Sequence, residues 1–183
     1  RRVLFRSLGD EPRIVGILNV TPDSFFDGGR FTAVDAAVAQ AHRLVSEGAA
    51  MIDLGGQSTR PGYTEVPVEE EIRRVVPVIT ALSASLPVPL SIDTYRSPVA
   101  RAALAAGAHV LNDIHGLLRD PALAGVAAEF GCPLVVMHNE PGFNEDPADP
   151  LPRMLRYFDR CLATATRSEE HTSELQSPMY LVC

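Results

Sequence analysis

The stretch PLSIDTYRSPVARAALAAGAHVLND, residues 89–113, contains one complete repeat of the pattern that decides the fold. A short apolar run, Pro89–Ile92, is followed by an alanine-rich segment with helical spacing, Pro98–Ala106, and then by a second apolar run, His109–Leu111. Apolar runs that do not alternate with polar residues are typical of parallel strands buried on both faces. The stretch therefore predicts a strand–helix–strand unit with parallel strands.

The same alternation continues in both directions along the chain, which makes the predicted fold class α/β. Eight units of this kind would need roughly 250 residues, the usual size of a closed barrel. Periodicity alone leaves two architectures open: a complete open sheet of five strands, or strands 1–5 of a truncated TIM (β/α)8 barrel. The further strands are predicted at Ile14–Leu18, Ala50–Leu54 and Leu134–Met137, and the further helices at Ala33–Ser46, Val68–Ser83, Pro121–Phe130 and Pro152–Ala165.

The composition limits the function classes. The chain has 183 residues, 46% of them hydrophobic, and a formal net charge of −7. Its 16 basic residues are all arginine, and no basic stripe that could neutralise nucleic-acid phosphates is visible. Neither an apolar run of about 18 residues nor a signal-peptide pattern occurs, so we expect a cytoplasmic protein.

The two ends differ from the middle of the chain. Arg1–Ser7 and Arg167–Ser177 show neither helical nor strand periodicity, and both resemble translated adapter DNA from short-read sequencing. Such segments are excluded from fold reasoning in the same way as tags. We therefore expect a non-native extension at residues 1–7, a partial barrel domain at 8–166 and a second non-native extension at 167–183.

A first polar cluster, Asn19–Gly29, follows the first predicted strand. It offers the amide of Asn19 and carboxylates that include Asp27. Hard oxygen ligands of this kind suit Mg²⁺ that is shared with phosphate oxygens. The alternative is an ordinary turn rich in Asp, Asn, Pro and Gly.

A second cluster, Asp53–Gly62, follows the second predicted strand and contains Arg60 among hydroxyl groups and glycines. A guanidinium group donates a planar fork of hydrogen bonds to an oxyanion such as phosphate. The alternative is a solvated loop arginine that pairs with Glu65.

Single polar residues end the later strands, at Asp93, Asn112 and Met137 to His138. The carboxyl ends of parallel strands point toward a common mouth. There, Asp93 and Asn112 could pair with the edge of a flat, amino-substituted heterocycle while Met137 packs on its face. For each residue taken alone, a strand cap or core filler is the simpler explanation.

The residues in these clusters resemble the dihydropteroate synthase family, the folate-pathway enzymes inhibited by sulfonamides. The similarity covers essentially all of residues 12–160. It rests on four motifs in order: Gly16-Ile17-Leu18-Asn19-Val20-Thr21-Pro22-Asp23-Ser24-Phe25, Ser58-Thr59-Arg60-Pro61-Gly62, Ser91-Ile92-Asp93-Thr94 and Asn112-Asp113-Ile114.

The resemblance implies a (β/α)8 barrel, of which the chain carries strands 1–5. The family joins 6-hydroxymethyl-7,8-dihydropterin pyrophosphate to 4-aminobenzoate, uses Mg²⁺, and is commonly dimeric. By the same resemblance, each candidate residue acquires a role. Asp93, Asn112 and Met137 would bind the pterin, Asn19 and Asp27 the metal and pyrophosphate, Arg60 the anion, and Phe25, Thr59 and Pro61 the 4-aminobenzoate.

The chain also departs from the family pattern. Phe26 stands where serine is common, and Gln57 where glutamate is common. The family's strands six to eight supply an aspartate, two lysines and an Arg-x-His anion site, but this chain has no lysine. We therefore expect a poorly soluble, inactive fragment of an active parent enzyme. Two alternatives stay open: a methyltetrahydrofolate–corrinoid methyltransferase domain and a non-catalytic pterin-binding module.

Overall fold

In this computed structural model, the described residues are 12–21, 30–57, 64–143, 149–169 and 179–182. Strands and helices alternate along the chain. The strands are β1 (Ile14–Asn19), β2 (Ala49–Gly55), β3 (Leu90–Asp93), β4 (Val110–Asp113), β5 (Leu134–Met137) and β6 (Met179–Val182), and the helices are α2 (Arg30–Ser46), α3 (Val68–Ser83), α4 (Ser97–Ala105), α5 (Ala122–Phe130) and α6 (Pro150–Glu169).

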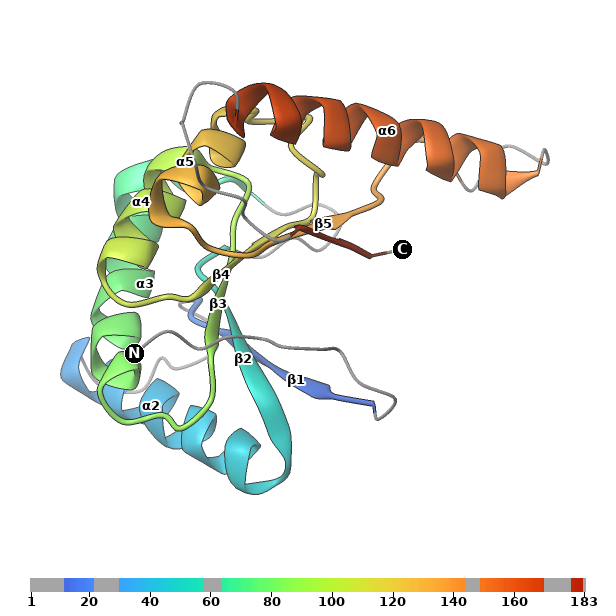
Figure 1. The fold of residues 1–183 in the computed structure, drawn as a ribbon. Coiled ribbons are helices and arrows are strands. Elements are labelled where there is room, and N and C mark those ends of the chain that lie inside the picture. The colour runs from blue at the N-terminus through green and yellow to red at the C-terminus, as the bar shows by residue number, and fades with distance from the viewer. Residues whose placement is uncertain (1–11, 22–29, 58–63, 144–148, 170–178, 183) are drawn as a thin grey trace.

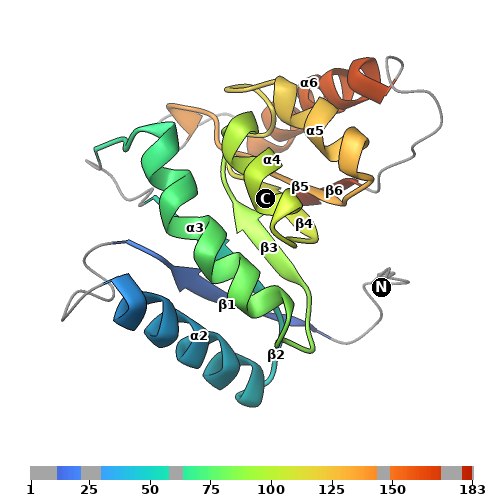
Figure 2. The ribbon, with the colours of Figure 1, turned by 90° about the vertical axis from the view of Figure 1, so that its left-hand side faces the viewer.

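The strands form one parallel sheet in sequence order, β1-β2-β3-β4-β5-β6. Helices α2 to α5 lie along one side of this sheet (Figures 1 and 2). The α/β class and the five predicted strands are thereby confirmed, with boundaries that differ by at most two residues. In the part of the chain described, no helix is long and apolar enough to cross a membrane.

Side chains alternate between the two faces of the sheet, and this alternation separates the core from the polar residues. Ile52, Leu54 and Ile92 are fully buried against the helices. Asp53 and Asp93 occupy the intervening positions and therefore face the opposite side. In β2 and β3, the helix-facing side chains form the core, while the opposite face carries polar groups.

Local sequence signals explain where the helices begin and end. The first turn of α3 contains Glu69, Glu70 and Glu71, whose negative charges are favourable near the positive end of the helix dipole. Gly131 caps the carboxyl end of helix α5 and adopts a left-handed conformation with φ 58°. Glycine takes this conformation without steric cost, so the chain can turn directly into β5.

Strand β1 departs from the expectation that each strand is buried on both faces. Ile14 and Ile17 are 63% and 69% exposed, and Val15 is also exposed. β1 is the edge strand of the sheet, and the helices cover only one of its faces. Burial on both faces is therefore wrong for β1, although an open apolar edge is what the partial barrel predicts.

A sixth strand was not predicted. β6 pairs in parallel with β5, from Leu134 opposite Met179 to Met137 opposite Val182. Its sequence, Met-Tyr-Leu-Val, has high strand propensity, and the free edge of β5 offers unpaired backbone groups. The expectations of strands 1–5 only and of an open edge at β5 are corrected accordingly.

Candidate functional site

The carboxyl ends of the first four strands carry a row of paired positions across the sheet. Asn19 is the register partner of Gly55, Gly55 of Asp93, and Asp93 of Asn112. Register partners in a parallel sheet point to the same face. The structure thus brings three predicted site residues, Asn19, Asp93 and Asn112, to one edge of one face.

Gly55 keeps a gap open in the middle of this row. A Cβ atom at this position would lie 3.4 Å from Asn19 Oδ1 and 3.7 Å from Asp93 Oδ2. The side chains of Asn19 and Asp93 therefore flank the same small space, which is lined by two oxygen atoms.

Met137 lies at the carboxyl end of β5, two residues beyond Val135, which is the register partner of Asn112. Two residues correspond to one full alternation along a strand, so Met137 shares the face of Asn112. It is half-buried. Met137 is therefore placed to line the same edge of the sheet as Asn112, two residues closer to the carboxyl end of its strand.

Asp53 is a member of the site that sequence reasoning missed. Asn112 Nδ2 donates a hydrogen bond of 2.9 Å to Asp53 Oδ2. Asp53 lies two residues before Gly55 in β2, and this spacing places it on the face of the row. The alternation of β2 is therefore the signal that could have identified it.

Asp93 is the most electrostatically perturbed group of the row. Burial raises the pKa of Asp93 to about 7, and the negative charges of Asp53, Asp113 and Glu71 act in the same direction. Within the described residues, no hydrogen bond to its carboxylate occurs. A ligand that offers N–H donors would supply the partners that this carboxylate lacks.

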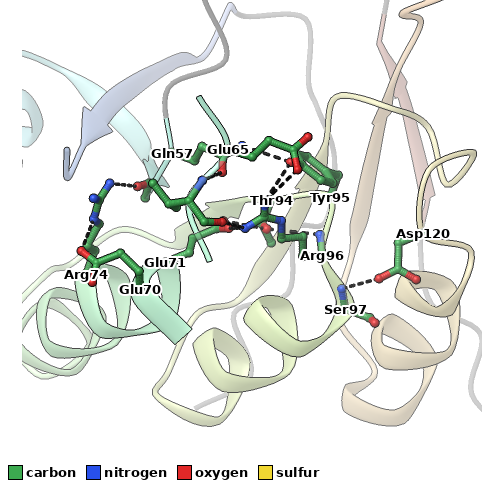
Figure 3. A network of polar contacts seen from close by, with 12 residues as sticks. Gln57, Glu65, Glu70, Glu71, Arg74, Thr94, Tyr95, Arg96, Ser97 and Asp120 are labelled. Atoms are coloured by element: carbon green, nitrogen blue, oxygen red, sulfur yellow. Dashed lines mark hydrogen bonds and ion pairs between the residues drawn. The ribbon is translucent and has the colours of Figure 1, made fainter. Parts of the chain in front are cut away.

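A polar network joins α3 to the end of β3 beside the row (Figure 3). Glu71 is 2% exposed and accepts hydrogen bonds from Thr94 Oγ1 at 2.9 Å and from an Arg96 Nη atom at 3.0 Å. Burial raises the pKa of Glu71, against the stabilising effect of these two partners. Thr94 directly follows Asp93, so the network fixes the backbone next to the row.

The same network connects Gln57, which precedes residues 58–63 in the sequence, with Glu65 and Val66, which follow them. Gln57 donates to Tyr95 Oη at 3.1 Å and accepts from the Val66 backbone N–H at 3.0 Å. Arg96 donates to the Val66 carbonyl and to Glu65. Gln57, which departs from the family's glutamate, thus uses both ends of its amide, one as donor and one as acceptor.

The remaining predicted site residues belong to the segments that follow β1 and β2 in the sequence. Glu65, the alternative partner for Arg60, forms ion pairs with Arg96 and Arg119. The residues that lie outside the described part of the chain are Phe25, Asp27, Thr59, Arg60 and Pro61.

Comparison with known proteins shows which family shares this arrangement. Residues 15–173 match a family model described as pterin binding enzyme. Dihydropteroate synthase from Bacillus subtilis is 48% identical over 149 residues, which cover 81% of this chain and 52% of that protein. The chain thus spans about half the length of the curated relatives it matches.

Solved structures agree with the sequence comparison. Dihydropteroate synthase from Clostridium difficile, in the presence of pteroic acid, has a TM-score of 0.85 and 40% identity, covering 94% of this chain and 64% of that one. The Xanthomonas albilineans enzyme with 4-aminobenzoic acid has a TM-score of 0.78 and 48% identity, covering 87% and 57%. These likenesses confirm the expected part of a (β/α)8 barrel. Because the family model covers most of its length, this chain belongs to the family of pterin-binding enzymes.

Proposed function

We propose that the chain is the pterin-binding part of a dihydropteroate synthase, which joins 6-hydroxymethyl-7,8-dihydropterin pyrophosphate to 4-aminobenzoate in folate biosynthesis. One observation carries this proposal. The sheet aligns Asn19, Asp93 and Asn112 at its carboxyl edge. The chain that does so has 48% and 50% sequence identity, over the matched residues, to two proteins named dihydropteroate synthase. Location of active sites at this edge is general for parallel α/β enzymes.

The pterin would lie across Asp93 and Asn112. Both side chains offer oxygen acceptors to the amino and ring N–H groups of an aminopyrimidine ring. Met137, at the rim of the same face, would pack its polarisable thioether against the ring. A flat heterocycle held at its edge and its face presents the exocyclic methylene carbon in one orientation.

The pyrophosphate group would lie at the Asn19 side of the row. Asn19 is an exposed residue, and its amide oxygen is a hard ligand of the type that Mg²⁺ takes in small numbers beside water and phosphate, so it fits this ion. We propose Asn19 and Asp27 as Mg²⁺ ligands and Arg60 as a donor to the anion. When bound, Mg²⁺ would neutralise negative charge on the pyrophosphate.

The reaction forms one C–N bond and breaks one C–O bond. The amino nitrogen of 4-aminobenzoate attacks the methylene carbon, pyrophosphate leaves with the electrons of the C–O bond, and the nitrogen then loses a proton to water. Negative charge accumulates on the leaving group, where Arg60 would stabilise it. Phe25, Thr59 and Pro61 would border 4-aminobenzoate and exclude water, the competing nucleophile.

Other properties of the parent enzyme belong to the same proposal. We infer a cytoplasmic enzyme with small-molecule substrates and without nucleic-acid partners, in line with the net charge of −7. The parent would be a homodimer. Since the chain spans about half of its relatives, we expect it to bind pterin without turnover. The corrinoid methyltransferase alternative is not favoured, because the relatives carry the synthase name.

Fluorescence titration of the 183-residue chain with pterin tests the proposal. We expect saturable binding that Asn112→Ala weakens about tenfold or more and that Arg156→Ala, on α6, leaves unchanged. No saturable binding, or equal binding by Asn112→Ala, would contradict it. Preference for 5-methyltetrahydrofolate over pterin would favour the methyltransferase. Pyrophosphate release at the rate of a complete relative would contradict the expected lack of turnover.

A further inference from the structure

We propose that Asp53 is a positioning residue that fixes the side-chain amide of Asn112 and so makes the pterin subsite select ligand edges that carry N–H donors. This inference rests on the proposed function and adds a determinant of specificity to it. The juxtaposition that carries it is the 2.9 Å hydrogen bond from Asn112 Nδ2 to Asp53 Oδ2.

The two residues come from strands that are not neighbours. Asp53 lies in β2 and Asn112 in β4, and their side chains meet over Ser91 of β3, the register partner of Asp53. An asparagine amide can rotate by a half turn and exchange its donor and acceptor ends at little cost. An ionised carboxylate accepts hydrogen bonds only, so contact with Asp53 allows just one of these two orientations.

The fixed amide determines what Asn112 offers to a ligand. With Nδ2 directed at Asp53, the carbonyl oxygen Oδ1 has no hydrogen-bond partner among the described residues. Asn112 is only half-buried, so this oxygen can meet a ligand. Asp93, its register partner, also lacks a hydrogen bond to its carboxylate in the described chain. Adjacent strands thus present two acceptors side by side.

Asp53 itself shows that the arrangement is incomplete without a ligand or water. Its second oxygen, Asp53 Oδ1, is buried and has no hydrogen-bond partner in the part of the chain described. Burial raises the pKa of Asp53, against the lowering effects of the nearby Ser91 hydroxyl, which does not form a hydrogen bond of normal geometry to it, and of the Asn112 amide. A residue with only a packing role would be better served by an apolar side chain, so the carboxylate points to a role in recognition.

A pair of ligands that differ at one position tests this inference. Pterin carries an amino group at position 2, whereas lumazine carries a carbonyl oxygen there and so presents an acceptor in place of a donor. We expect the wild-type chain to bind pterin more tightly. Asp53→Asn keeps the volume but removes the charge and permits either amide orientation, so the ratio of the two dissociation constants should fall by about tenfold.

Two further variants separate positioning from a structural effect. Ser91→Ala removes the buried hydroxyl beside Asp53 but leaves the Asp53–Asn112 bond, and it should not change the ratio. In an Asn112→Ala background, Asp53→Asn should have no additional effect on the ratio, because Asp53 acts through Asn112. Equal weakening of both ligands by Asp53→Asn would indicate a structural role and overturn the inference.

A measurement on the ligand-free chain covers the case in which Asp53→Asn does not fold. NMR should show slow hydrogen exchange for one Nδ2 proton of Asn112 and faster exchange at the exposed Asn139, whose Nδ2 makes only a long contact of 3.5 Å with His115 Nδ1. Equally fast exchange at both residues would overturn the inference. Failure of the wild-type chain to bind either ligand would overturn the proposed function too, whereas an unchanged ratio in a folded Asp53→Asn variant would overturn this inference alone.

Discussion

The hydroxyl of Thr94, the residue that follows Asp93, donates a 2.9 Å hydrogen bond to the buried carboxylate of Glu71. This contact joins α3 to the end of β3, and Arg96 completes it with a charge partner for Glu71 at 3.0 Å. Burial of a charged carboxylate costs free energy unless such partners are present. The packing of α3 is thus connected directly to the backbone of the candidate site.

Arg96→Ala should therefore be strongly destabilising. It leaves Glu71 buried without its cation, a change that typically costs about 3–5 kcal/mol. Urea denaturation followed by circular dichroism measures this loss. Arg101→Ala is the matched control, because the Arg101–Glu129 pair is half exposed and screened by water, and its removal should have little effect. Equal stability of both variants would contradict the assigned role of the network.

Asp93→Asn should change how stability depends on pH. The pKa of Asp93 is raised from 3.8 to about 7, so between these values the folded chain holds a proton that the unfolded chain has lost. The stabilisation is therefore complete below pH 4 and falls as the pH rises to 7, by at most about 1.4 kcal/mol per pH unit for one proton.

Removal of this carboxylate removes its share of the slope. Asp93→Asn should gain stability relative to the wild type as the pH rises from 4 to 8, although it replaces one carboxylate oxygen that could accept from the pterin with an N–H donor. Denaturation curves at pH 4.5, 6 and 8 measure the difference. A difference between the two proteins that stays constant with pH would show that Asp93 titrates normally.

Gly55→Ala should weaken pterin binding without unfolding the chain. The added methyl group would lie 3.4–3.8 Å from Asn19 and Asp93, which is ordinary contact, but it occupies the space between them. Gly125→Ala is the control: its added methyl group meets nothing within 4 Å in α5, and it should stabilise the helix by about 0.5–1 kcal/mol. Titration with pterin and thermal unfolding of both variants separate the effects. Unchanged pterin affinity in Gly55→Ala would place the ligand elsewhere.

Ile17→Thr should improve solubility at almost no cost in stability. Ile17 is 69% exposed on β1, where threonine keeps strand propensity and removes apolar surface. Ile52→Thr, at a fully buried position in β2, should instead cost about 2 kcal/mol or more. Light scattering and urea denaturation measure the two properties. A stability loss in Ile17→Thr equal to that in Ile52→Thr would show that the β1 face is covered.

The strands and helices could be predicted because their signals are local. An apolar run such as Ile14–Leu18 and a periodic segment such as Val68–Ser83 carry their own pattern. Asp93 and Asn112 could be predicted for the same reason, since each is a polar residue that ends an apolar run. The register that aligns them with Asn19 follows directly from a parallel sheet.

The parts that were missed depend on contacts between residues far apart in sequence. Asp53 meets Asn112 only because β2 and β4 both flank β3, and the Glu71–Arg96 pair requires α3 to pack on the end of β3. β6 is four residues long and follows no periodic segment, so only the available edge of β5 determines its place. The roles assigned to Phe25, Asp27, Thr59, Arg60 and Pro61 remain predictions.

NMR chemical-shift mapping of the chain on addition of pterin tests the central claim most directly. We predict that the backbone amides of Gly55, Asp93 and Asn112 shift with a common saturation curve, while the helix-facing Ile52 and Leu111 do not. Shifts confined instead to α6, around Arg156 and Arg160, would contradict the claim that the carboxyl edge of the sheet is the pterin site.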